Sequence, residues 1–179
     1  MNKNNKKLIN LFARYILILL AGLNSLYIFY KLLTLPTLYL SKIFLSIFTS
    51  AVIVDNFIAI PNHLIEIIPA CVAGSAYYLL FILLMAIPEI KILKRIKTIL
   101  FAFLVLLIIN SLRIAFLALL PQNLFNATHL IFWYFVSTIL AIAIYFTTIK
   151  LFKIKNIPVY DDVKFLLSIK KTKKSKRNK

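Results

Sequence analysis

The chain has 179 residues, 62% of them hydrophobic, and a mean hydropathy of +0.92. A soluble domain of this length cannot bury so much apolar side chain, so the composition excludes a soluble fold and predicts an all-α polytopic membrane protein. The apolar runs are continuous and do not alternate with polar residues, which excludes a membrane β-barrel.

The net charge of +17 comes from 22 basic and five acidic residues, and the basic residues flank the apolar runs. This placement is typical of cytoplasmic loops and of segments that meet anionic lipid headgroups. We therefore expect a lipid bilayer, and no nucleic acid, as the partner of these charges. The single cysteine allows no internal disulfide.

Five apolar stretches follow one another, and a membrane span needs about 20 apolar residues. The first, fourth and fifth are long enough, and the third is slightly short. The first lacks the small-residue cleavage site of a signal peptide, so we expect it to be retained as a membrane segment. We predict four to five transmembrane helices in a single domain over residues 1–150, followed by a basic, disordered cytoplasmic tail over residues 151–179. The stretches are 8–33, 36–54, 71–87, 98–120 and 128–149.

Basic residues also predict the orientation of the chain. The connection from Lys91 to Lys97 and the segment from Lys150 to Lys179, which holds eleven Lys and Arg residues, should both be cytoplasmic. The fourth stretch then runs outward and the fifth runs inward. Cys71, Arg113 and His129 are consequently all expected near the outer face.

The second stretch, residues 36–54, leaves two alternatives open. Its Thr and Ser residues fall near helical spacing, which is typical of an amphipathic helix that lies in the outer leaflet. The alternative is a full crossing, which requires the N-terminus to lie outside despite its lysines.

Residues 55–68 predict a short outer-side β-hairpin or flap that leads directly to Cys71. Turn signals at Asp55-Asn56 and at Pro61 separate β-branched runs. The flap contains His63 and Glu66, which are either exposed polar residues of a turn and strand or groups that orient a substrate.

Cys71 itself has two interpretations. A lone cysteine in a membrane segment is ordinarily a small buried hydrophobic residue. Pro69, however, predicts a helix start, where free backbone N–H groups and the helix dipole favour a reactive thiolate. Gly74 and Ser75, three and four residues further on, would lie on the same face and let other groups approach closely.

Three more residues are unusual in or beside apolar runs. Arg113 either extends to the outer headgroups or lines a polar pocket, and Asn110 on the same helical face favours the pocket. His129 follows a predicted helix start and is either an interfacial anchor or a functional group. No pair of ligands has a spacing suited to zinc, so no metal is expected.

Together these residues suit cysteine-based acyl transfer. A thiolate can attack a carbonyl, a histidine can move protons, and an arginine can stabilise the oxyanion or hold a carboxylate. The order Pro-Ala-Cys71-x-x-Gly-Ser, then Asn110-x-x-Arg113-Ile114, then His129 resembles the exosortase/archaeosortase family of integral-membrane cysteine transpeptidases. The resemblance covers about residues 36–149, most of the predicted membrane domain.

The resemblance implies that Cys71 is the nucleophile and that Arg113 and His129 complete the catalytic set, with Asn110, Gly74 and Ser75 in support. It implies no cofactor. The implied substrates are exported proteins with a C-terminal signal made of a short motif, an apolar helix and a basic cluster. They would be cleaved near the motif, on the extracytoplasmic face of the plasma membrane, and transferred to a lipid or another acceptor.

One departure from the family's pattern stands against a full match. The chain has Val72-Ala73 directly after the cysteine, where many members have a hydroxyl-bearing residue and then glycine. The alternative function is that of a non-enzymatic small membrane protein, an assembly partner or transporter subunit, in which the polar residues join helices to one another.

Overall fold

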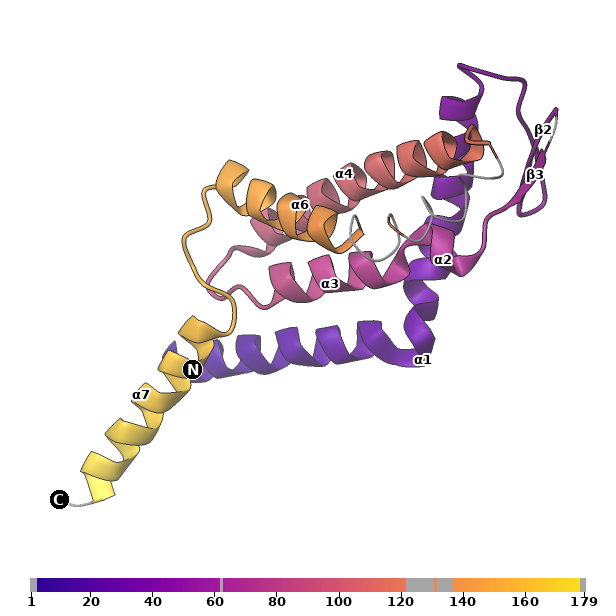
Figure 1. The fold of residues 1–179 in the computed structure, drawn as a ribbon. Helices are drawn as coiled ribbons and strands as arrows, with labels where there is room; N and C mark the ends of the chain where they lie inside the picture. Colours follow the sequence, from indigo (N-terminus) through magenta and orange to yellow (C-terminus); the bar gives the residue numbers. More distant parts are fainter. Residues whose placement is uncertain (1–2, 62, 122–130, 132–136, 178–179) are drawn as a thin grey trace.

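The computed structural model describes residues 3–61, 63–121, 131 and 137–177, which are mostly helical and include one small antiparallel sheet (Figure 1). The predicted helical framework with a β flap before Cys71 is therefore confirmed for these residues. In chain order the elements are α1 (Lys3–Leu45), β1 (Val52–Val54), β2 (Phe57–Ile60), β3 (His63–Glu66), α2 (Pro69–Val72), α3 (Gly74–Met85), α4 (Ile92–Ala118), α6 (Ser137–Leu151) and α7 (Tyr160–Arg177).

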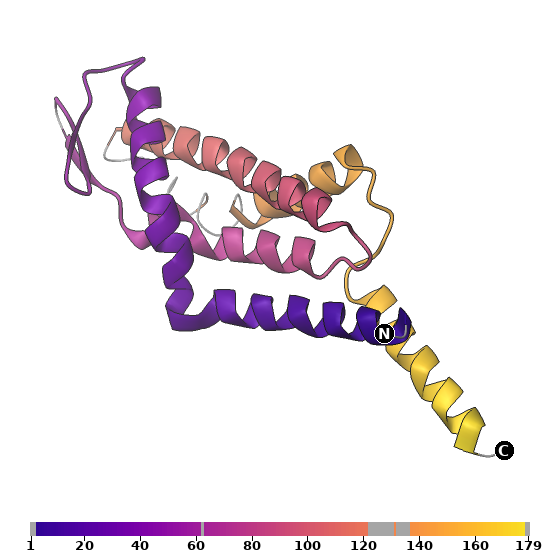
Figure 2. The same ribbon diagram turned by 180° about the vertical axis from the view of Figure 1, so that it is seen from behind.

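Helix α1 is broken in its middle. Asn24, Ser25 and Leu26 have left-handed φ angles of 53°, 52° and 63°. L-residues ordinarily enter this region singly, and Asn does so most readily, so three in succession end one helix and start another in a new direction. The apolar stretch 8–33 therefore forms no continuous helix. The chain turns between a first limb, residues 3–22, and a second limb, residues 27–45 (Figures 1 and 2).

Helix α3 is the centre of the described bundle. It packs against α1, α4 and α6, and its side chains Tyr77, Leu80 and Leu84 are almost completely buried. Tyr77 also meets Phe103 of α4 edge to face, with ring centroids 5.1 Å apart. Burial of these large side chains supplies the main packing energy that holds α3 between its neighbours.

The bundle has two ends with different content (Figures 1 and 2). One end holds the start of α1, the α3–α4 connection, the C-terminal end of α6 and the start of α7. The other end holds α2, the C-terminal end of α4, the second limb of α1 and the sheet. The lysine-rich connection and the tail thus share one end, and Cys71 lies at the opposite end, which is the relative placement that the charge distribution predicts.

The flap is a three-stranded meander with the strand order β1-β2-β3. Val54 pairs with Phe57 across a two-residue turn, in which Asp55 has a left-handed φ of 52°. Ile58 in the central strand is fully buried against the bundle. The β-branched run at Val52–Val54 forms the first strand, so the sheet has three strands where a two-stranded hairpin or flap was expected.

The second limb of α1 is amphipathic, but its polar side faces inward. Thr37 and Ser41 are fully buried, whereas Leu35, Tyr39 and Ile43 are more than half exposed. The limb contacts α2, β1 and β2 as well as the bundle helices. The expected amphipathic helix is therefore present only as far as Leu45, its Thr37 and Ser41 side chains pack against the bundle, and the stretch 36–54 ends in β1.

Two of the described helices are long and apolar enough to cross a membrane, namely α1, as Asn5–Leu45, and α4. Helix α3 has 12 residues and is about 18 Å long, which is less than the hydrocarbon core of about 30 Å. Helix α6 has 15 residues. The expected count of four to five transmembrane helices is therefore not supported by these lengths.

The basic tail, expected to be disordered, contains helix α7 over Tyr160–Arg177. Asp161 and Asp162 lie in its first turn, where negative charge interacts favourably with the helix dipole. Asp162 is 6% exposed and forms an ion pair with Arg14 of α1. A charge pair therefore attaches the start of α7 to the first limb.

Candidate active site

Cys71 lies in α2, a single helical turn between the sheet and α3. Ile68 before the turn is extended, Pro69 opens it, and Ala73 after it is left-handed with a φ of 59°. The Cys71 N–H donates to the carbonyl oxygen of Ile68 at 2.8 Å, and the Cys71 side chain is partly buried. The predicted helix start at Pro69 is confirmed, but the helix ends after Val72.

The shortness of α2 changes the electrostatic argument for a reactive thiol. A helix dipole is the sum of aligned peptide units, and α2 has only four residues. The N–H of Cys71 is also already bonded to Ile68. The helix start therefore contributes little to a thiolate, and a charged neighbour must contribute more.

Asn110 of α4 holds the backbone at Cys71. Its Nδ2 donates to the carbonyl oxygen of Cys71 at 2.8 Å, across 39 residues of sequence, and the side chain is only 2% exposed. A buried amide without a partner is costly, so this bond satisfies Asn110 and attaches the α2 turn to α4.

Arg113 lies three residues after Asn110, on the same side of α4. It is partly buried, and although burial of the thiol is the larger effect and acts against a thiolate, the Arg113 charge acts on Cys71 in the opposite direction. A positive charge at this position stabilises a thiolate and the oxyanion that forms when a thiolate attacks a carbonyl. Glu66, at the end of β3, also interacts with Cys71, but its carboxylate repels a thiolate.

The Tyr30 ring of α1 packs against Gly74 and leaves no room for a side chain at this position. A Cβ at this position would lie 2.6 Å from Cε1 and 2.8 Å from Cζ of Tyr30, so any larger residue forces the ring or the helix to move. The expected close approach at Gly74 is thus present, and the group that approaches is Tyr30. Ser75 is exposed, and the left-handed Ala73 interrupts the helical spacing that was expected to align it with Cys71.

The structure brings together Cys71, Asn110, Arg113 and Glu66 from three separate elements. His63 is the first residue of β3. His129, the expected proton carrier, lies outside the residues that the structure describes. The described part of the site therefore contains the candidate nucleophile, the candidate oxyanion group and the residue that positions the nucleophile's backbone.

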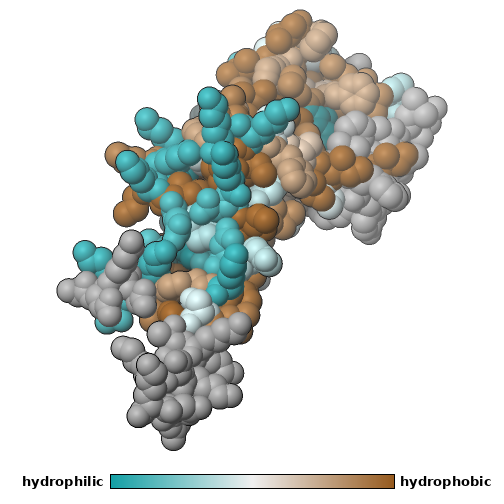
Figure 3. Space-filling view, turned by 90° about the vertical axis from the view of Figure 1, so that its left-hand side faces the viewer, coloured by the Kyte–Doolittle hydropathy of each residue, from teal (hydrophilic) through white to brown (hydrophobic). Residues whose placement is uncertain are grey.

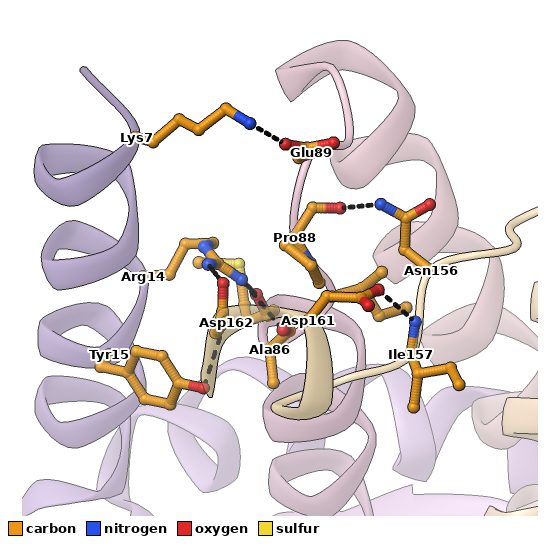
Figure 4. Close-up of polar contacts among 12 residues, drawn as sticks. Lys7, Arg14, Tyr15, Ala86, Pro88, Glu89, Asn156, Ile157, Asp161 and Asp162 are labelled. Atoms are coloured by element: carbon orange, nitrogen blue, oxygen red, sulfur yellow. Dashed lines mark hydrogen bonds and ion pairs between the residues drawn. The ribbon is translucent and has the colours of Figure 1, made fainter. Parts of the chain in front are cut away.

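A polar cluster that the sequence did not point to lies at the opposite end of the bundle (Figure 4). Arg14 donates to Asp162 Oδ1 at 2.6 Å and to the carbonyl oxygen of Ala86 at 2.9 Å, and Arg95 donates to that of Met85 at 2.6 Å. The two arginines thus bind the last carbonyl groups of α3, which have no partner within the helix. The available sequence signal is an arginine within an apolar run, which marks Arg14 as it marks Arg113.

Within the described ranges, no three His, Cys, Asp or Glu side chains gather in a way that could hold a metal ion. Comparison of the chain with family models, with curated proteins and with solved structures finds no match. The chemistry of the site therefore has to be argued from its own residues.

Proposed function

We propose that this chain is a membrane-embedded cysteine protease/transpeptidase whose nucleophile is Cys71. The observation that carries the proposal is the convergence of Asn110 and Arg113 of α4 on Cys71. One helix thereby supplies a group that fixes the nucleophile's backbone and a group that stabilises negative charge. The resemblance to the exosortase/archaeosortase family includes these three positions together with His129.

The membrane location is supported by the polarity of α4. Residues at intervals of four on its exposed side are all apolar, whereas its buried side includes Arg95, Thr98 and Asn110. A helix on the surface of a soluble protein has the reverse pattern, and hydrocarbon is the solvent that suits an apolar exterior. The exposed stripe consists of Ile96, Leu100, Leu104, Ile108, Leu112 and Phe116.

In this proposal the chain crosses the plasma membrane with four segments: the first limb of α1, α2 with α3, α4, and the segment that ends with α6. The second limb of α1 lies at the outer boundary, with exposed Leu35, Tyr39 and Ile43 toward lipid. The lysine-rich end is cytoplasmic by the positive-inside rule. Cys71 and Arg113 then face the extracytoplasmic side.

The proposed reaction has two steps. The Cys71 thiolate attacks the scissile carbonyl carbon, Arg113 stabilises the oxyanion, and the C–N bond breaks as the leaving amine takes a proton from His129. A C–S thioester joins Cys71 to the new C-terminus of the substrate. An acceptor hydroxyl, amine or water then attacks the thioester, gives its proton to His129 and releases Cys71.

The proposed substrates are exported proteins whose C-terminus carries a short motif, an apolar helix and a basic cluster. Such a signal has the same arrangement as this chain's own spans, with basic residues at the cytoplasmic end. The motif would consequently stop at the outer membrane surface, at the depth proposed for Cys71. The sheet, which leads directly from Glu66 to α2, is the element that would present the motif.

The test compares the membrane proteome of the encoding organism with that of strains carrying Cys71→Ala or Cys71→Ser. We expect proteins with a C-terminal apolar helix and basic cluster to retain both in the variant strains. Alanine has no nucleophilic group, and a serine hydroxyl ionises far less readily than a thiol. Ser75→Ala, an exposed change four residues away, is the matched control and should process normally. Full processing in the Cys71→Ala strain would contradict the proposal.

A second candidate is favoured by one observation. The Asn110–Cys71 bond uses the cysteine's carbonyl group and leaves the thiol out, as a purely structural helix contact would. A non-enzymatic assembly partner or transporter subunit predicts that Cys71→Ala is silent in the proteome comparison. The same measurement thus separates the two candidates.

A further inference from the structure

A groove lies beside the polar cluster at the end of the bundle opposite Cys71. Its volume is about 670 Å³, and its walls come from the first turns of α1, the α3–α4 connection and the segment that enters α7. Figure 3 looks at this side of the molecule, where hydrophilic side chains gather between apolar surfaces. The volume is in the range of small-molecule binding sites.

The acidic side chains of the groove are already engaged within the protein. Glu89 pairs with Lys7, and Asp162 pairs with Arg14 and accepts a hydrogen bond from Tyr15 (Figure 4). Asp161 accepts a hydrogen bond from the backbone N–H of Ile157 at 3.0 Å. These contacts hold the walls together, and Glu89 and Asp162 neutralise two of the five basic side chains, which leaves three lysines against the single carboxylate of Asp161.

Three basic side chains of the lining remain. Lys6, Lys155 and Lys164 line the groove, are exposed, and form no salt bridge within the described part of the chain. Lys6 comes from the start of α1, whereas Lys155 and Lys164 come from the C-terminal segment that enters and begins α7. The groove therefore presents converging positive charge, which suits a phosphate group better than a neutral or cationic ligand.

Helices α1 and α7, which carry Lys6 and Lys164, also expose apolar side chains. Ile9 and Phe12 of α1 are 57% and 61% exposed, and Val163 and Leu167 of α7 are 48% and 55% exposed. A ligand that contacts both kinds of surface has a phosphate and acyl chains. We infer that this groove binds the headgroup of an anionic phospholipid of the cytoplasmic leaflet, an inference that rests on the membrane orientation proposed above.

The test measures binding to the full-length chain in a neutral detergent. The probes are short-chain phosphatidylglycerol, phosphatidylcholine with the same acyl chains, and inorganic phosphate. Phosphatidylglycerol should bind and raise the unfolding temperature, because a ligand that binds only the folded state stabilises it. The groove variant Lys6→Gln/Lys155→Gln/Lys164→Gln should weaken that binding about a hundredfold, since each lysine near an anionic surface is worth on the order of a fivefold change.

The matched control is Lys91→Gln/Lys94→Gln/Lys97→Gln, which removes the same charge at the same end of the bundle but outside this groove. It should retain phosphatidylglycerol binding. Equal loss in both triple variants would show diffuse surface attraction and overturn the inference, as would unchanged binding in the groove variant. If inorganic phosphate stabilised the chain equally, the groove would bind a soluble anion and the inference of a lipid ligand would be overturned. None of these outcomes depends on activity at Cys71.

Discussion

Gly74 and Asn110 fix the position of Cys71 by two different means. Asn110 binds the Cys71 carbonyl group from α4, and Gly74 lets the Tyr30 ring of α1 approach the start of α3. The reactive residue is therefore located by groups that take no part in the proposed chemistry. This explains how a one-turn helix between two irregular segments can hold a nucleophile in a defined place.

We expect Gly74→Ala to destabilise the folded chain by about 1–3 kcal/mol, because the added methyl group overlaps the Tyr30 ring. Thermal unfolding in detergent measures this cost, with Ser75→Ala as a neutral control. In the double variant with Tyr30→Ala the two costs should not add, since the smaller residue removes the overlap. Additive costs would contradict the contact.

The sequence identifies Cys71, Asn110 and Arg113 because each is rare in an apolar run, and the structure places all three at one site. Rarity does not reveal packing partners, so the role of Tyr30 depends on a contact across 44 residues that no local pattern encodes. His129 stays a prediction. The helix start at Pro69 is visible in the sequence but its early end at Ala73 is not, so the sequence overstates what the helix dipole contributes to a thiolate.

At the scale of elements, the break in α1 decides the architecture of the bundle. The apolar pattern of residues 8–33 has no proline, and nothing in its hydropathy indicates an interruption. The signal that was available is the pair Asn24-Ser25, because both residues compete with helix through local hydrogen bonds. The sheet was easier to predict, since its turns carry explicit signals at Asp55-Asn56 and Pro61.

Ser25→Gly tests the break by the sign of its effect. At a left-handed position glycine avoids a penalty of about 1–2 kcal/mol, so the variant should be at least as stable as the original chain. In a continuous helix the same change would cost about 0.5 kcal/mol, the difference in helix propensity between serine and glycine. Ala13→Gly, on the exposed side of the first limb, is the control and should destabilise. Thermal unfolding of both variants in one detergent distinguishes a broken α1 from a continuous helix.

Docking of α7 depends on the Arg14–Asp162 pair, whose side chains are 6% and 8% exposed. Asp162→Asn leaves Arg14 buried without its counter-charge, which we expect to cost about 3–5 kcal/mol and to release α7. Limited proteolysis after the lysines of α7 should accelerate in this variant and not in Asp161→Asn. Unchanged cleavage would show that α7 is held by other contacts.

At the scale of the whole molecule, an apolar core also encloses several polar groups, while many apolar side chains are exposed. The buried set includes Arg14, Arg95, Thr98, Asn110 and Thr148, while most of the exposed surface of α1 and α4 is Leu, Ile and Phe. Such an arrangement is stable only when the surrounding solvent is apolar or the surface is covered. It also concentrates the polar residues at the two ends, one with Cys71 and one with the lysine-rich groove.

The claim on which the proposed function depends is that Cys71 is a reactive thiol, open to the extracytoplasmic side and activated by Arg113. Labelling of intact cells with a membrane-impermeant maleimide tests it directly. The Cys71→Ala variant, which has no thiol, gives the background signal. The account predicts labelling without permeabilisation and about tenfold slower labelling in Arg113→Gln, because loss of the guanidinium disfavours the thiolate. Labelling that requires permeabilisation, or a rate that does not change in Arg113→Gln, would contradict it.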